Sequence, residues 1–231
     1  MLAPNAASMP AWWASSNRFR QCQENPATHH YLIKNAMSNV YKLETARIVL
    51  RKWRSEDYTE FARMNTDPDV MRYFPSLLSR KESDIQAKKF DNLVAEKGWG
   101  FWAAQRKSDS AFIGLVGLNQ ADDLPVASCM EVGWRLAKAY WGEGYATEAA
   151  TASLHFAFSL LEQDRVAAFT APANSRSRKV MSRLGMEDRQ ENFLHPRISQ
   201  STGLKEFVYY EISRERFYRS FQENSVAISS Q

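Results

Sequence analysis

Apolar residues recur along most of the chain in two patterns: short runs and longer stretches at helical spacing. The short runs, bounded by turn residues, predict strands over residues 43–51, 100–106, 112–118, 129–136, 166–170 and 207–212. The longer stretches predict helices over residues 55–65, 79–96, 145–161 and 175–184, with one short helix after a turn within residues 67–75. Residues 107–110 are typical of a hairpin turn, and residues 192–205 of an irregular connection. This order of elements predicts an α/β fold with a mixed sheet.

Polar residues and glycines at the helix ends support these boundaries. Ser55 is predicted to cap the first helix, because a serine oxygen can accept a backbone N–H of the first turn. Gly98 is predicted to end the second helix. That helix is predicted to bury one face made of Ile85, Phe90, Leu93 and Val94.

Two closely spaced glycines, Gly142 and Gly144, join the strand that ends near Leu136 to the helix that begins near Tyr145. Glycine lets the backbone turn sharply and approach a ligand closely. The first amides of the helix point back into this turn without intrahelical partners. The sequence therefore predicts an anion-binding loop, and a diphosphate is the kind of group that such a loop holds.

A second polar segment follows the strand over residues 166–170. Asn174 is predicted to be the N-cap of the last long helix, and Ser177 lies in its first turn. Gly185 is predicted to end that helix in the left-handed conformation. Asn174 and Ser177 could be ordinary capping residues, but their position after a glycine loop also makes them candidates for a site.

Together these segments resemble the GNAT superfamily of N-acetyltransferases. The family's loop has the pattern Gln/Arg-x-x-Gly-x-Gly/Ala, and it is followed by Asn-x-x-Ser and a Leu-Gly-Phe-like helix end. The flanks Glu131–Leu136 and Ala146–Ala149 are most similar to the ribosomal-protein N-acetyltransferase-like branch. Ala139 departs from the usual Gln/Arg, and Met181 stands where many relatives have tyrosine.

The resemblance covers residues 43–218 and implies the acyl-CoA N-acyltransferase fold, with a central sheet splayed open at the cofactor cleft. It implies transfer of acetyl from acetyl-CoA to a primary amine, on a protein N-terminus or a small molecule, by direct attack. The implied cofactor-binding residues are Val132, Gly133, Trp134, Leu136, Trp141, Gly142, Glu143, Gly144, Tyr145, Ala146 and Asn174.

The implied catalytic residues are Glu131, as a base acting through water, and Ser177, facing the thioester sulfur. Ser177 is the candidate source of the leaving-group proton, because Met181 cannot donate one. Tyr73, Phe74 and His195 are candidates to bind the acceptor. His195, or water, is an alternative base, and Glu131 could instead point to the opposite face of its strand and support structure.

Composition excludes several other classes of protein. The 231 residues carry a net charge of +4 without a basic block, so no nucleic-acid partner is expected. No apolar run approaches the roughly 18 residues of a membrane span. Four histidines lack metal-ligand spacing, so no metal is expected. Cys22 and Cys129 lie far apart, which favours the reducing cytoplasm over a disulfide framework. A monomer or homodimer is expected.

Three regions are predicted along the chain. Residues 1–36 are expected to be a disordered tail or a mis-assigned start, residues 37–220 the acetyltransferase domain, and residues 221–231 a C-terminal tail. The departures at Ala139 and Met181 leave a second interpretation open, a non-catalytic acyl-CoA-binding or sensing module.

Overall fold

The computed structural model describes residues 32–34, 40–122, 124–126, 130–196, 198 and 203–220. The strands are β1 (Leu32–Lys34), β2 (Tyr41–Glu44), β3 (Ile48–Arg51), β4 (Phe101–Arg106), β5 (Phe112–Gln120), β6 (Met130–Leu136), β7 (Arg165–Thr170), β8 (Glu187–Asp188), β9 (Phe193–Leu194) and β10 (Glu206–Ser213). The helices are α2 (Asp57–Asn65), α3 (Arg80–Lys97), the 3-10 turn η3 (Lys138–Tyr140), α4 (Tyr145–Ser159) and α5 (Ser175–Arg183). Residues 214–220 are also helical.

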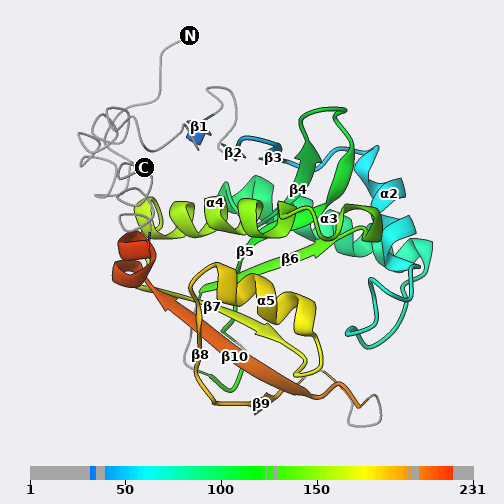
Figure 1. The fold of residues 1–231 in the computed structure, drawn as a ribbon. Coiled ribbons are helices and arrows are strands. Elements are labelled where there is room, and N and C mark those ends of the chain that lie inside the picture. The colour runs from blue at the N-terminus through cyan, green and yellow to red at the C-terminus, as the bar shows by residue number, and fades with distance from the viewer. Residues whose placement is uncertain are drawn as a thin grey trace.

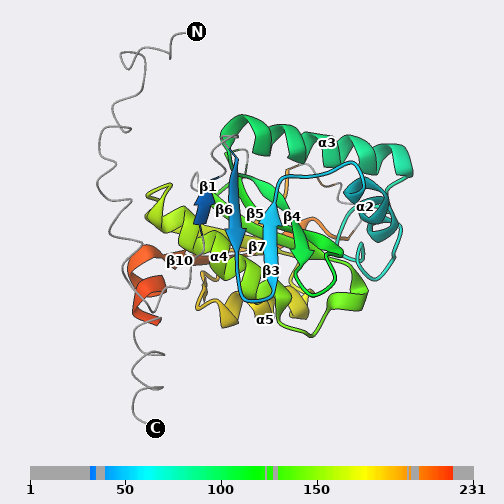
Figure 2. The ribbon, with the colours of Figure 1, turned by 90° about the horizontal axis from the view of Figure 1, so that it is seen from above.

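One mixed sheet organises these elements in the order β1-β2-β3-β4-β5-β6-β7-β10-β8, and β9 pairs with β10 (Figure 1). Its pairs are antiparallel except β6 with β7, which are parallel and joined through α4. The sheet bears α2 and α3 on one face and α4 and α5 on the other (Figure 2). The predicted mixed α/β fold is therefore confirmed.

The main core lies between the sheet and α4. Trp102, Leu154 and Phe156 are fully buried there, and the rings of Trp102 and Phe156 meet edge to face with centroids 5.5 Å apart. A second core under α2 and α3 contains Trp53 and Phe61, whose ring centroids are 5.2 Å apart. Both faces of the central strands are thus covered, which explains why these strands are continuous apolar runs rather than alternating ones.

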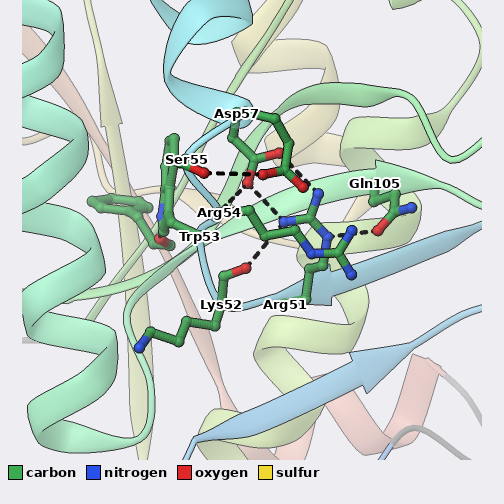
Figure 3. A network of polar contacts seen from close by, with 9 residues as sticks. Arg51, Lys52, Trp53, Arg54, Ser55, Asp57 and Gln105 are labelled. Carbon is green, nitrogen blue, oxygen red and sulfur yellow. Dashed lines mark hydrogen bonds and ion pairs between the residues drawn. The ribbon is translucent and has the colours of Figure 1, made fainter.

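The start of α2 is held by a buried ion pair rather than by the predicted serine cap. Asp57 accepts two hydrogen bonds from the Arg51 guanidinium, at 2.7 and 2.8 Å, and a third from the backbone N–H of Arg54 at 2.7 Å (Figure 3). Gln105 accepts from Nε of Arg51 at 2.5 Å. The prediction of Ser55 as N-cap was wrong. The Asp57 carboxylate, two residues later, accepts the backbone N–H of Arg54 and also neutralises the Arg51 guanidinium.

Three other predictions of local structure were wrong. The single strand over residues 43–51 is a hairpin, because the Thr45 side chain accepts from the Ile48 N–H at 2.9 Å and turns the chain. Residues 67–75 form turns, not a short helix. Ile85, predicted to be buried, is 61% exposed, whereas Val94 of the same predicted face is buried together with Ser83 and Ala87.

The helix ends predicted from glycine and polar residues are confirmed at α3 and α5. Ser79 and Glu82 form a capping box, and Gly98 ends α3 at φ 81°. Gly185 follows α5 at φ 77°. Helix α4 ends at Ser159, two residues before the predicted end.

Part of the predicted N-terminal tail is a strand. Residues 32–34 form β1 and pair with β2 in the register Leu32 with Leu43. The described residues do not include residues 1–31, 35–39 and 221–231. Cys22 and Cys129 also lie outside them. No described helix has the length and apolar content to cross a membrane.

Candidate active site

The sheet opens between β6 and β7. Strand β6 pairs with β5 along its whole length, from Met130 to Leu136, but with β7 only at Met130 and Glu131. From Val132 onward, the edge of β6 that faces β7 has no strand partner in the described chain. The backbone groups of this edge are therefore available to a ligand, because a ladder group without a strand needs another partner.

Side chains of β6 alternate between the two faces at this opening. Val132 and Leu136 are buried in the main core on the α4 face, and Trp134 packs against that core. Gly133 lies on the opposite face, where a Cβ would come within 2.9 Å of the Phe101 ring. The absence of a side chain at Gly133 therefore leaves room for the Phe101 ring.

The glycine loop lies at the end of β6, as predicted. Gly142 has φ 86° and Gly144 has φ 81°, and both angles favour glycine. Nothing lies within 4 Å of a Cβ placed on Gly142, and only Nη2 of Arg47, at 3.4 Å, is near one placed on Gly144. Gly144 is the N-cap of α4, so the first amides of that helix face the open space beside the loop. The loop therefore fits a diphosphate.

The turn between β2 and β3 supports the loop from one side. Oε1 of Glu148 accepts from the Thr45 hydroxyl at 2.6 Å and from the Arg47 N–H at 2.8 Å, while Oε2 accepts from Nε of Arg47 at 2.6 Å. Burial alone would raise the pKa of Glu148, but these hydrogen bonds hold that pKa below its ordinary value. The Arg47 guanidinium lies 4.7 Å from the centre of the Tyr145 ring. The first turn of α4 is thus fixed, although Glu143 in the loop itself is exposed.

Trp141 and Arg176 connect the two arms of the opening. Nε1 of Trp141 donates to the Leu136 carbonyl at 2.8 Å, and the Arg176 guanidinium lies 4.6 Å from the centre of the indole. Trp141 follows β6, whereas Arg176 belongs to the first turn of α5, which follows β7. Among the described residues Arg176 makes no ion pair, although its charge helps, after those of Lys138 and Arg72, to lower the pKa of Asp69.

Asn174 and Ser177 form the predicted cap of α5. Oδ1 of Asn174 accepts from the Ser177 N–H at 3.2 Å, and its Nδ2 donates to Oγ1 of Thr170 at 2.8 Å and to Oγ of Ser177 at 3.1 Å. The Ser177 hydroxyl accepts in this arrangement, so its own proton can be donated elsewhere. Met181 is buried in the main core, which explains its presence as an apolar residue at that position.

Glu131 and His195, the two alternative bases, line one cavity of about 70 Å³. The cavity lies on the face opposite α4, and its walls are Asn119, Ala121, Leu124, Glu131, Phe169, His195 and Phe207. Nδ2 of Asn119 donates to Oε2 of Glu131 at 3.1 Å, across the β5–β6 pairing. The His195 ring lies 5.1 Å from the Phe207 ring, and the His195 N–H donates to the Lys205 carbonyl at 2.8 Å.

The other predicted acceptor residues, Tyr73 and Phe74, lie outside the walls of this cavity. The Tyr73 hydroxyl donates to the Ala173 carbonyl at 3.0 Å, just before α5. The Phe74 ring lies 4.0 Å from the guanidinium of Arg135. Lys138 pairs with Asp69 at 2.6 Å, so the segment over residues 67–75 is attached to both arms of the opening.

Arg135 is held among neutral groups on the same face as Glu131. Its Nη1 donates to Asn65 at 2.7 Å and to Gln86 at 3.2 Å, and its buried Nε has no hydrogen-bond partner. Burial lowers the pKa of Arg135 to about 10, so the guanidinium stays charged near neutral pH. Arg135 thereby joins β6 to α2, α3 and the Phe74 turn.

Sequence reasoning missed Asn119, Phe169, Arg176 and Phe207. Asn119 could have been found only from the register that places it opposite Glu131. Phe169 and Phe207 belonged to predicted strands, but the face on which each lies depends on how β7 and β10 pair. Among the described residues, no cluster of three metal-binding side chains is present.

Comparison with known proteins gives consistent results. A model of the acetyltransferase (GNAT) domain matches residues 47–187. YkkB of Bacillus subtilis (strain 168) is 35% identical over 150 residues, covering 63% of this chain and 84% of the relative. YnaD of the same strain, named as an N-acetyltransferase, is 28% identical over 178 residues, covering 76% of this chain and 98% of the relative. The crystal structure of a GNAT-family acetyltransferase from Bacillus anthracis aligns with a TM-score of 0.62 and 23% identity, over 75% of this chain and 99% of that one.

Proposed function

Since this chain belongs to the GNAT acetyltransferase family, we propose that it acetylates a primary amine held beside Glu131, with acetyl-CoA bound along the open edge of β6. The chain is an N-acetyltransferase, and the proposal concerns how its own residues carry out the reaction. One observation supports it most: the unpaired edge of β6 begins at Val132, next to Glu131, and leads toward the glycine loop. Acetyl-CoA supplies an activated thioester at the end of a long chain that carries a diphosphate.

The cofactor-binding residues fall into two groups. The backbone from Trp141 to Ala146 binds the diphosphate, with the amides of the first turn of α4 as donors. The backbone of residues 132–136 binds the pantetheine amides, and Asn174 contacts the same arm with the free lone pair of its Oδ1. Arg176, stacked on Trp141, adds a positive charge where the phosphates pass.

The reaction itself is a displacement at the thioester carbon. The neutral amine attacks, the C–N bond forms and the C–S bond breaks, with a backbone N–H near Val132 stabilising the developing oxyanion. Glu131 takes the proton that the amine loses, through water, and the Ser177 hydroxyl hydrogen-bonds the departing sulfur. Glu131 and Ser177 lie on opposite faces of the opening, as base and leaving-group donor should.

Orientation contributes more than proton transfer in this scheme. Well-oriented reactants can lower a barrier by roughly 7 to 11 kcal/mol. A positioned acid or base typically contributes 10²- to 10⁴-fold, which is about 3 to 5 kcal/mol. Loss of Glu131 should therefore slow the enzyme without abolishing turnover, and His195 in the same cavity is the second candidate base.

Release of thiol from acetyl-CoA in the presence of a panel of primary amines tests this function. We expect amine-dependent release in the wild type, and a Glu131→Gln variant with lower kcat, a displaced acidic limb of its pH profile and unchanged affinity for acetyl-CoA. A matched control is Glu191→Gln, an exposed carboxylate of the loop that leads to β9. Binding of acetyl-CoA without turnover of any amine would instead support a non-catalytic acyl-CoA-binding module.

The cellular setting is part of the same proposal. A cytoplasmic enzyme that needs no metal and acts as a monomer or homodimer fits the sequence, because its two cysteines lie far apart and its histidines lack metal-ligand spacing. Its partner is the amine-bearing acceptor, and neither nucleic acid nor a membrane is required.

A further inference from the structure

The chemical character of the cavity beside Glu131 limits which amines can be the acceptor. Four of its seven wall residues have hydrocarbon side chains: Ala121, Leu124, Phe169 and Phe207. A carboxylate, a carboxamide and an imidazole complete the wall. An acceptor nitrogen that reaches Glu131 therefore lies beside polar groups and aromatic rings together.

The polar and aromatic walls together favour a positively charged nitrogen. The Glu131 carboxylate, oriented by Asn119 at 3.1 Å, attracts an ammonium group directly. Phe169 and Phe207 line the same space, and an aromatic face attracts a cation within about 6 Å of its centre. A primary amine, which is protonated at neutral pH in free solution, is recognised in this form before it loses a proton.

The size of the cavity limits what surrounds that nitrogen. Its volume is about 70 Å³, less than half of the roughly 150 Å³ in which an apolar cavity accommodates benzene. A straight chain of methylene groups fits such a space, whereas a ring or a carbon that bears a side chain and a carbonyl does not.

We propose that the acceptor is the end of an unbranched alkylammonium chain, such as a lysine side chain or a linear diamine, rather than a peptide N-terminus or an amino sugar. This inference rests on the proposed function, since it assigns the cavity to the acceptor of that reaction. The ammonium enters beside Glu131 and gives one proton to that carboxylate through water. The neutral nitrogen then attacks the thioester carbon, the C–S bond breaks, and the second proton leaves on the sulfur of CoA. The product amide is uncharged, so its attraction to Glu131 is lost and release is favoured.

Two isomers of acetylated lysine amide provide a direct test. The Nα-acetyl isomer presents the ε-amine on a straight chain, and the Nε-acetyl isomer presents the α-amine on a branched carbon, with the same atoms in both. We expect kcat/KM for the ε-amine to exceed that for the α-amine by at least about 10-fold. Cadaverine should also be acetylated, and glucosamine should not.

A variant of the cavity wall tests where the preference originates. Phe207→Ala enlarges the cavity and should reduce the ratio between the two isomers at least 5-fold, whereas Ile85→Ala, an exposed change on α3, should leave the ratio unchanged. Equal or better use of the α-amine or of glucosamine by the wild type would overturn the inference while leaving the acetyltransferase function intact. An unchanged ratio in a folded Phe207→Ala enzyme would overturn the assignment of the cavity. Failure to acetylate any amine, with acetyl-CoA still bound, would overturn the proposed function and the inference together.

Discussion

A single methyl group added at Gly142 separates the role of this glycine in the fold from its role in binding. Gly142 has φ 86°, and a Cβ at this position has no protein atom within 4 Å. Gly142→Ala therefore causes no steric clash, and its cost to stability is the left-handed backbone of an alanine, roughly 1 to 2 kcal/mol. For a domain of this size that corresponds to a fall in Tm of roughly 2 to 8 °C.

The same methyl group occupies the space that the diphosphate needs. A hydrogen bond to a charged group contributes about 1.5 to 3 kcal/mol. Loss of one such bond should raise the Kd for acetyl-CoA by about 10- to 150-fold, measured by calorimetry. Gly203→Ala is the matched control, since Gly203 has φ 66° and is equally open, but lies in the loop before β10. If both variants lose the same stability and both bind acetyl-CoA like the wild type, the glycine loop is not the diphosphate site.

Four further outcomes follow from the structure. Ser177→Ala should lower kcat about 10- to 100-fold with unchanged affinity for acetyl-CoA, and a normal kcat would remove Ser177 from the mechanism. Arg176→Ala should weaken acetyl-CoA binding about 2- to 5-fold, with a larger effect at low salt, whereas Lys179→Ala on the exposed side of α5 should leave binding unchanged. Equal effects of the two substitutions would refute a specific role of Arg176 in binding. Burial lowers the pKa of His155, so the unfolded chain takes up the proton first and stability falls as pH drops below about 6.5. The fall in Tm between pH 7.5 and 5.5 should therefore be smaller in His155→Gln than in the wild type. Identical falls in the two proteins would contradict this. A chain that begins at Met37 lacks β1 and should melt a few degrees lower, while an unchanged Tm would show that the pairing of β1 with β2 adds nothing to stability.

Local signals in the sequence were sufficient for most of the fold. The Asn174 cap of α5, the glycines after α3 and α5, and the apolar runs of β4, β5, β6 and β7 each act within a few residues, and the structure has them where they were expected. Predictions failed where a competing partner or the packing of an element decides the outcome. Ser55 was displaced as a cap by Asp57, whose carboxylate pairs with Arg51 at the end of β3. Ile85 is exposed because the sheet contacts a different face of α3.

The candidate site likewise has parts that could be predicted from local sequence and parts that could not. The glycine loop and the Asn174 cap are local structures, so their backbone geometry could be predicted from spacing alone. The cavity could not be predicted as a unit, because its walls come from five separate parts of the chain. Glu131 and His195 were independent candidates in the sequence, and the pairing of β10 with β7 and β9 explains why they share one space.

The unpaired half of β6 has a consequence for the protein outside its catalytic cycle. An exposed strand edge is a template on which another chain can add a strand, and proteins usually cover or charge such edges. In the proposed function the edge stays open for acetyl-CoA, so protection falls to that ligand. Bound acetyl-CoA would cover the edge, whereas a purified and ligand-stripped preparation would present it to neighbouring molecules. Self-association of this enzyme should therefore depend on how well it is supplied with CoA as much as on its own concentration.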